Sequence, residues 1–289
     1  MKKVMITGAN GFMGQHLAIY LQNAGFDVLA TGKGPSRIPF EINYFPLDIT
    51  APDQVRDFFH QNHPDIIIHT AAMSKPDECN NNRALCIQVN VEATKYLINE
   101  SDGHFVYIST DFIFGEHGPH AEMDEPCPLN FYGESKLMAE KTISNSKRKS
   151  TIVRPVFMYG KIWEGMKPTF LHWVKKSLEE GKKIKVTSDQ WRTPTYINDI
   201  CQGIEIILSK EATGVYHLAG KDIVTPYEMA VKTAQLLSLD TSLIEKVTAD
   251  TFPETVKRAR RSGLMIEKAR KELGYEPISF EEGVRLTFG

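Results

Sequence analysis

The sequence contains few cysteines, and their arrangement excludes several classes of protein. Its 289 residues include four cysteines, Cys79, Cys86, Cys127 and Cys201, with no Cys-X-X-Cys pair and no metal-like spacing to histidines. We therefore expect neither a disulfide-rich secreted scaffold nor a metal site, but reduced thiols in a cytoplasmic protein. The early apolar stretch ends at Thr7, too soon for the core of a signal peptide.

Long apolar runs and an excess of charge of one sign are also missing. No stretch approaches the roughly 20 apolar residues that a membrane-spanning helix requires, so no membrane partner is expected. The chain has 34 lysines and arginines against 36 acidic residues, a formal net charge of −2. A nucleic-acid partner is not expected, because such proteins present a strongly basic surface.

Short β-branched runs alternate with amphipathic stretches through the first half of the chain. This alternation predicts an α/β fold, a Rossmann-type doubly wound parallel sheet with helices on both faces. The expected strands are 4–7, 28–31, 44–47, 65–69, 104–109 and 150–154. The expected helices are 11–23, one opening at Pro52, 82–100 and 131–144.

After residue 155 the alternation of strands and helices becomes less regular. We expect helices at 168–180, 198–209, 226–237 and 266–273, with short strands near 185–187, 196 and 215–218. Residues 1–155 are predicted to form the nucleotide-binding domain, and 156–289 a smaller substrate-binding lobe. Parts of 185–220 are expected to rejoin the first domain.

The segment TGANGFMG follows the first strand and opens the first helix. Its glycines, Gly8, Gly11 and Gly14, have the spacing of a dinucleotide-binding loop. In such a loop one glycine makes the tight turn, one lets the backbone approach a pyrophosphate, and one lets the helix pack on the sheet. The helix N-terminus then offers N–H groups to the phosphates. We therefore predict a bound dinucleotide.

The end of the second strand indicates which dinucleotide is preferred. NAD-binding proteins usually place an acidic residue there, for the ribose 2′-hydroxyl. Here the segment is ATGKGPSR, which has no acid but offers Lys33 and Arg37 to a 2′-phosphate. We expect NADP(H) to be preferred, with NAD(H) as the alternative. Both cations could instead be solvated loop residues.

The segment YGESK places Tyr132 and Lys136 four residues apart, on one face of a helix. A phenol has a pKa near 10 and is a poor acid–base group at neutral pH. A nearby ammonium is expected to lower that pKa. The pair could therefore protonate an oxygen while hydride arrives at the neighbouring carbon.

Four segments in this order resemble a known superfamily. TGANGFMG, IIHTAA, STDFIFG and YGESK are similar to the motifs of extended short-chain dehydrogenase/reductases. The segments STDFIFG and PLNFYGESKLMAEK are closest to the dTDP-4-dehydrorhamnose reductase (RmlD-like) family. The resemblance covers most of the chain and is strongest through residue 160. It implies an NAD(P)H-dependent reductase of a keto group on a nucleotide-linked sugar, with a tyrosine as proton donor and nicotinamide as hydride donor.

The resemblance also implies roles for individual residues. Thr110, Tyr132 and Lys136 match the catalytic trio. Asp48 and Ile49, which match the family's acidic pair, are expected near adenine. Two alanines are expected beneath the cofactor and a Pro-Val pair at its nicotinamide end. The implied cofactor-binding residues are Gly8, Asn10, Gly11, Phe12, Met13, Gly14, Asp48, Ile49, Ala71, Ala72, Asn90, Tyr132, Lys136, Pro155 and Val156.

The expected substrate is a nucleotide-linked sugar, whose diphosphate requires cations. Arg192 resembles an arginine that serves this purpose in relatives, and Arg260, or its neighbour Arg261, stands where later motifs place another. Met73 and Thr110 are expected at the substrate mouth. The run AAMSKPDECNNN departs from the rhamnose-pathway pattern and leaves the sugar open. Family members are often dimeric, which makes a homodimer the expected assembly.

Other interpretations remain at this stage. The chain could be a nucleotide-sugar epimerase or dehydratase, a reductase of another ketone, or a non-catalytic NADP-binding regulatory subunit. Asp48 could cap a helix, Asn90 could be structural, and His69 is expected to be a core histidine. The acidic run that begins at Glu122 is expected in a solvated loop.

Overall fold

The computed structural model describes residues 2–253 and 255–289, and seven parallel strands of that part form its central sheet. The strand order is β10-β6-β5-β4-β1-β2-β3. The chain adds β2 and β3 on one side of β1 and then continues with β4, β5 and β6 on the other, as in doubly wound folds. The strands are β1 (Lys3–Thr7), β2 (Asp27–Gly32), β3 (Tyr44–Pro46), β4 (Ile66–His69), β5 (His104–Ile108), β6 (Ser150–Arg154) and β10 (Gly214–His217). The predicted Rossmann-type sheet is thus confirmed.

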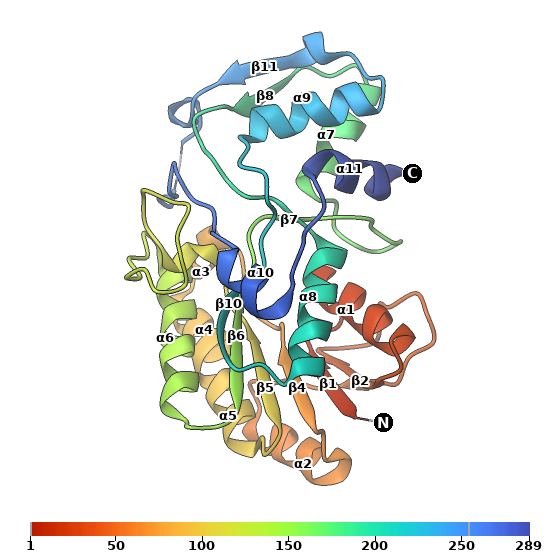
Figure 1. Cartoon of the computed structure of the whole chain (residues 1–289), viewed down its shortest axis with the longest axis vertical. Helices are drawn as coiled ribbons and strands as arrows, with labels where there is room; N and C mark the ends of the chain where they lie inside the picture. Colours follow the sequence, from red (N-terminus) through yellow and green to blue (C-terminus); the bar gives the residue numbers. More distant parts are fainter. Residues whose placement is uncertain (1, 254) are drawn as a thin grey trace.

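Helices cover both faces of this sheet because its strands are apolar on both sides. Val4 and Ile6 point to one face, towards α1 (Phe12–Asn23) and α8 (Ile197–Lys210), whereas Met5 points to the other. On that other face lie α2 (Pro52–Asn62), α5 (Ala93–Glu100) and α6 (Phe131–Asn145). Figure 1 shows α1 and α8 to the right of β5 and β6, and α4, α5 and α6 to their left.

The helix predicted at 82–100 contains one irregular turn. It begins as α4 (Arg83–Ile87), capped by the Asn82 side chain, widens into the π-helical segment η1 (Gln88–Glu92) and continues as α5. The short α3 (Pro76–Asn81) precedes it and was not predicted. Such π turns often mark functional sites, and η1 contains Asn90.

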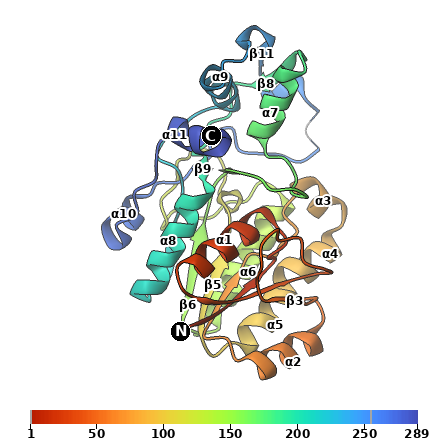
Figure 2. The same cartoon turned by 90° about the vertical axis from the view of Figure 1, so that its right-hand side faces the viewer.

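A second lobe lies above the carboxyl ends of the strands (Figure 2). It pairs β8 (Ile184–Thr187) with β11 (Ile244–Val247) and packs them against α7 (Phe170–Glu179) and α9 (Pro226–Leu236) around its own apolar cluster. The unpredicted segments of this half include β11 and α11 (Phe280–Phe288). A short pair, β7 (Met158–Tyr159) with β9 (Thr195–Tyr196), links the lobes.

The chain returns from this lobe to the central sheet. β10 pairs in parallel with β6. Residues of α8 and α10 (Glu267–Leu273) join the apolar core on the face of the sheet that α1 covers. The expected return at 215–218 therefore occurs, whereas the strand near 185–187 pairs with β11 instead. Within the described residues, no helix has both the length and the apolar character needed to cross a bilayer.

Candidate functional site

The glycine loop lies at the carboxyl end of β1, as predicted. Gly8 has φ +69°, and a Cβ there would lie 2.7 Å from the Ala71 backbone. A Cβ on Gly14 would lie 2.3 Å from the Gly8 carbonyl oxygen, which explains how α1 approaches the turn so closely. The Gly11 N–H donates to that same oxygen at 2.8 Å. Each glycine therefore meets a steric demand of its own.

The N-terminus of α1 is suited to a phosphate. Gly11 is its N-cap and provides no side-chain cap, and the first turn contains no acidic residue. The first N–H groups of a helix have no partner within the helix, and the helix dipole favours an anion there. Phe12 and Met13 stand at these positions. The loop therefore fits the diphosphate of a dinucleotide.

Asn10 has a role that the sequence did not reveal. Its Nδ2 donates to Pro35 O at 2.9 Å and to Tyr44 Oη at 2.8 Å, and its Oδ1 accepts from Arg37 N at 2.8 Å. The side chain thus ties the glycine loop to the segment after β2, where selection between the two dinucleotides is expected. Arg37 itself is exposed and makes no ion pair within the described part of the chain.

Lys33 forms an ion pair with Asp48, with its Nζ 2.8 Å from Oδ2. Asp48 also accepts two hydrogen bonds from Thr50, and Lys33 and Thr50 together lower the pKa of this carboxyl to about 2. The N-cap of α2 is Ala51, so the alternative of Asp48 as a helix cap is wrong. The two residues proposed for opposite ends of the adenosine therefore lie side by side, next to buried Ile49.

His69 is a core residue, as expected. Its ring nitrogens lie 2.7 Å from the Thr7 hydroxyl and 3.0 Å from the Thr94 hydroxyl. Burial and the nearby charge of Lys136 lower the pKa of the imidazole to about 3. Ala71 and Ala72 follow at the end of β4, both half-buried, and the Ala71 backbone faces Gly8.

Asn90 uses its whole side chain to hold protein groups. Oδ1 accepts from Met73 N at 2.8 Å, and Nδ2 donates to Met73 O at 3.0 Å and to Ser135 Oγ at 2.9 Å. Ser135 in turn donates to the carbonyl of Tyr132. These contacts support the structural interpretation of Asn90, which ties the segment after β4 to the helix that carries the tyrosine.

Thr110 and Tyr132 meet beside β5. Thr110 follows the strand and caps a short 3-10 turn by accepting from Phe112 N at 3.2 Å. Burial raises the pKa of the Tyr132 phenol, and a side-chain hydrogen bond with Thr110 acts in the opposite direction. The phenol pKa is thus raised rather than lowered as the sequence suggested, so the phenol keeps its proton at neutral pH. The neighbouring Ser109 hydroxyl is buried and has no partner among the described residues.

Lys136 lies one helical turn beyond Tyr132 and is only 2% exposed. Its Nζ donates to Ile108 O at 2.6 Å and stands 4.1 Å from the centre of the Tyr107 ring. Burial lowers the pKa of this ammonium to about 7, although Glu140 acts to raise it. The environment thus moves the pKa values of phenol and amine apart, a feature of sites that transfer protons.

Pro155 and Val156 are buried at the end of β6, close to this group in the sheet order. Val156 O accepts a hydrogen bond from Thr195 of β9 at 2.8 Å. The strand end expected at the nicotinamide is therefore also the point where the second lobe attaches. The lobe also reaches the loop that follows β5. The charge of its buried Arg192 opposes the rise that burial produces in the pKa of Asp111.

The two arginines predicted to bind substrate occupy different environments. Arg192 is 8% exposed and donates to Ser262 Oγ and Gln190 Oε1, each at 3.1 Å. Arg260 lies at the surface, where it contacts Asp189 at 3.1 Å and Asp250 at 2.6 Å. A cavity of about 270 Å³ lies between Arg260 and Gln190, the hydrogen-bond partner of Arg192. Its lining residues are Gln190, Ala249, Asp250, Phe252, Arg258 and Arg260.

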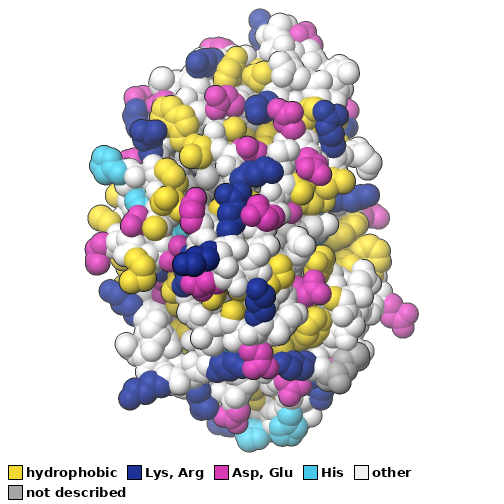
Figure 3. All heavy atoms as spheres, in the orientation of Figure 1, with side chains coloured by type: hydrophobic (Ala, Val, Ile, Leu, Met, Phe, Trp, Pro, Cys, Tyr) yellow, Lys and Arg dark blue, Asp and Glu magenta, His cyan; other side chains and the backbone are white. Residues whose placement is uncertain are grey.

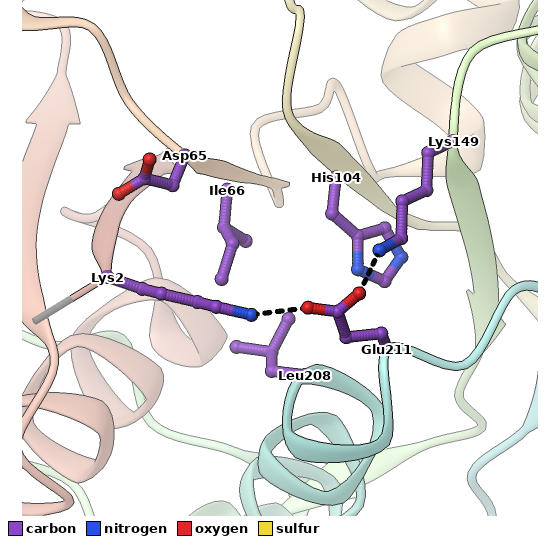
Figure 4. A pocket seen from close by; sticks show the side chains of 7 residues that line it. All are labelled: Lys2, Asp65, Ile66, His104, Lys149, Leu208 and Glu211. Carbon is purple, nitrogen blue, oxygen red and sulfur yellow. Dashed lines mark hydrogen bonds and ion pairs between the residues drawn. The ribbon is translucent and has the colours of Figure 1, made fainter.

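A second cavity, of about 360 Å³, lies at the opposite edge of the sheet, where its strands begin. Figure 4 shows Lys2 and Lys149 directed at one carboxylate, that of Glu211, at 2.7 and 2.5 Å. Ligands of open α/β sheets bind at the carboxyl ends of the strands, so this cavity is not the candidate site. Figure 3 shows acidic and basic side chains interspersed over one face of the molecule, with no large patch of one sign.

Two buried charged residues near the site were not predicted from the sequence, and a third was assigned to the wrong environment. Glu140 and Arg154 form an ion pair beneath Lys136. The side chain of Glu122 is only 7% exposed and accepts the N–H of His217 at 3.0 Å, so its prediction as a solvated loop residue is wrong. The spacing of Tyr132, Lys136 and Glu140, four residues each, was the available signal for one of them. No group of three or more potential metal ligands gathers within the described residues.

Comparison with known proteins agrees with this geometry. A family model described as RmlD substrate binding domain matches residues 1–288. The spore coat polysaccharide biosynthesis protein SpsK of Bacillus subtilis is 30% identical, over 99% of this chain and 96% of its own. Methionine adenosyltransferase 2 subunit beta of Danio rerio is 29% identical, over 98% and 89%.

A solved structure extends the agreement to three dimensions. The crystal structure of dTDP-4-dehydrorhamnose reductase from Bacillus anthracis, in complex with NADP, has a TM-score of 0.88 and 28% identity, and the match covers 100% of this chain and 99% of that one. The motifs, the fold and the family model therefore lead to one assignment. The chain belongs to the RmlD family of the extended short-chain dehydrogenase/reductases, a class of NAD(P)-dependent oxidoreductases.

Proposed function

We propose that this protein is an NADPH-dependent reductase of a keto group on a nucleotide-linked sugar. The observation that carries the proposal is the buried group formed by Thr110, Tyr132 and Lys136 at the carboxyl end of β5. The relative of known structure, a dTDP-4-dehydrorhamnose reductase in complex with NADP, supports both the cofactor and the class of substrate. The departure of residues 71–82 from the rhamnose-pathway pattern leaves the identity of the sugar open.

In this proposal each member of the trio acts on one atom. When bound, nicotinamide supplies a hydride to the carbonyl carbon. Tyr132 donates its phenolic proton to the carbonyl oxygen, which becomes the hydroxyl of the product. Thr110 hydrogen-bonds that oxygen and the phenol, and the Lys136 ammonium stabilises the phenolate that remains. Because the three groups are buried, these interactions are stronger than they would be in water.

The second lobe would hold the nucleotide. Arg258 and Arg260 line the 270 Å³ cavity and provide cations for a diphosphate, and the exposed ring of Phe252 at its edge offers a surface for a base. Arg260 would have to exchange its contacts with Asp189 and Asp250 for the ligand. We accordingly propose 1–155 as the cofactor domain, with β10 completing its sheet, and 156–289 as the substrate lobe.

The direct test is oxidation of NADPH, followed by absorbance, with a panel of nucleotide-linked 4-keto sugars. Turnover of at least one sugar is expected, and Tyr132→Phe should reduce kcat by about 10²–10⁴-fold, the usual contribution of a positioned acid. Cofactor affinity should change little, because the phenol ring remains. Near-wild-type kcat in Tyr132→Phe would refute the assignment of the proton donor.

One observation favours a second candidate. The chain is 29% identical over nearly its whole length to methionine adenosyltransferase 2 subunit beta, whose name describes a subunit of another enzyme. A regulatory subunit would bind NADP and turn over no sugar of the panel. Thermal shift with NADP, together with the absorbance assay, separates the two candidates.

A further inference from the structure

Glu140 and Arg154 form a buried ion pair on the face of α6 that carries the proposed proton donor. Arg154 Nε donates to Oε1 at 3.0 Å and Nη2 donates to Oε2 at 2.6 Å, and the two side chains are only 5% and 6% exposed. Removing both charges from water is costly, and well-packed apolar residues often replace such pairs without loss of stability. The position of this pair therefore calls for an explanation beyond stability.

The explanation lies one turn away. Glu140 follows Lys136 by four residues, a spacing that places the two side chains next to each other on a helix. Among the charges acting on Lys136, Glu140 has the largest effect, and it opposes the loss of the proton that burial favours. The other titratable groups that face this lysine come from the surrounding strands and helices: His69, Cys79, Cys86, Tyr107 and Tyr132. Of these, His69 is neutral at physiological pH.

Arg154 is in turn held by groups around β6 and the neighbouring β10 of the central sheet. Its Nη1 lies 3.3 Å from Glu122 O and 3.3 Å from His217 Nε2, and its guanidinium covers the Phe114 ring at 5.2 Å. His217 Nδ1 faces Met265 O at 3.2 Å and can only donate to it, which leaves Nε2 to accept from Arg154. Burial lowers the pKa of this imidazole to about 3, so it adds no competing charge. The arginine therefore has one orientation, and it holds the carboxylate of Glu140 in place.

We propose that Glu140, oriented by Arg154, is a positioning residue that keeps Lys136 protonated in the reaction. The inference rests on the proposed function for the role of Lys136 itself. Without the carboxylate, the buried amine would retain the Ile108 carbonyl as a hydrogen-bond partner but would lose the adjacent negative charge. A neutral amine could not stabilise the phenolate that Tyr132 leaves behind, and turnover would fall as pH rises.

The test compares wild-type protein with Glu140→Gln, both saturated with NADP(H). The ¹³Cε shift of Lys136, assigned with Lys136→Arg, is followed against pH, and kcat/KM is measured over the same range. We expect the lysine midpoint to fall by at least one pH unit and the descending limb of kcat/KM to move with it. At pH values above both lysine midpoints, kcat/KM of Glu140→Gln should then be at least tenfold lower than that of the wild type.

Glu140→Asp is the matched control, because it keeps the charge and should restore most of the midpoint. If Glu140→Gln does not fold because Arg154 is left unpaired, the double variant Glu140→Gln/Arg154→Met removes both charges, and its lysine midpoint should still fall. A purely structural role would lower kcat/KM equally at every pH with an unchanged lysine midpoint, and that result would overturn the proposal. The carbon shifts need no turnover, so an inactive wild type would count against the proposed function while they still decide the effect of Glu140 on Lys136.

Discussion

Gly14 and Gly11 of TGANGFMG should respond differently to alanine, since their added Cβ atoms would be obstructed to different degrees. A Cβ on Gly14 would lie 2.3 Å from Gly8 O and 2.7 Å from Ala9 Cα, well inside the 3.0 Å below which real Cβ contacts essentially do not occur. Both obstacles are backbone atoms, which no rotamer change can move. A Cβ on Gly11 would meet only Gly8 O, at 3.1 Å, in a backbone conformation that alanine readily adopts, with φ −84° and ψ 169°.

The magnitudes follow from these contacts. Gly14→Ala should gain about 1 kcal/mol of helix propensity but lose more, since α1 must move away from the turn; overpacking typically costs about 1–3 kcal/mol. We expect a net fall in Tm of a few degrees, because 1 kcal/mol shifts the Tm of a chain this large by roughly 2–4 °C. Gly11→Ala should change the Tm of the protein alone by less than that.

Added NADP should reveal the effect of Gly11→Ala, which is small in the protein alone. Its methyl group would stand where the backbone is expected to approach the diphosphate, so we expect at least tenfold weaker binding. Tenfold corresponds to about 1.4 kcal/mol, hence a loss of roughly 3–6 °C from the NADP-induced rise in Tm.

Scanning calorimetry with and without NADP measures both effects. Gly25→Ala, at φ +87° with open space around it, is the control for a surface glycine whose replacement strains only the backbone. It should lower the Tm and leave the NADP-induced rise unchanged. A Gly14→Ala protein with unchanged Tm, or a Gly11→Ala protein that keeps the full NADP-induced rise, would refute the reasoning.

Three further outcomes are expected. Lys33→Ala with Arg37→Ala should raise KM for NADPH at least tenfold and leave KM for NADH nearly unchanged; equal changes in steady-state assays with both cofactors would argue against a 2′-phosphate site. Burial raises the pKa of Asp199 to about 6, above its usual value of 3.8, so the native state binds the extra proton between these values and stability falls as pH rises through them. Asp199→Asn should therefore raise Tm more at pH 7 than at pH 4, and calorimetry showing the same shift at both pH values would contradict this. Arg260→Ala should raise KM for the sugar nucleotide with kcat nearly kept, whereas an unchanged KM would remove this residue from the substrate site.

Much of the cofactor half was predictable because its signals are local. The strand at 66–69 and the helix at 131–145 differ from prediction by a residue at most at either end, since short apolar β-branched runs and N-caps such as Asn130 act over a few positions. The unpredicted α11 lies at the end of the chain, where its apolar stripe packs against residues of the second lobe. The strand β11 needs β8, about 60 residues earlier, as its partner, and no local pattern indicates that pairing.

The sequence by itself determined the alternation of strands and helices, the steric need for three glycines, and the common face of Tyr132 and Lys136. Backbone sterics and helical periodicity are properties of neighbouring residues, so local sequence is enough to show them. Only the tertiary structure decided that Lys136 is buried and that its carboxylate partner is held by an arginine from β6. It alone brought Arg192 to Asp111 across 81 positions of sequence. Burial and long-range contact set the pKa values of the site, and both arise only when separate segments pack together.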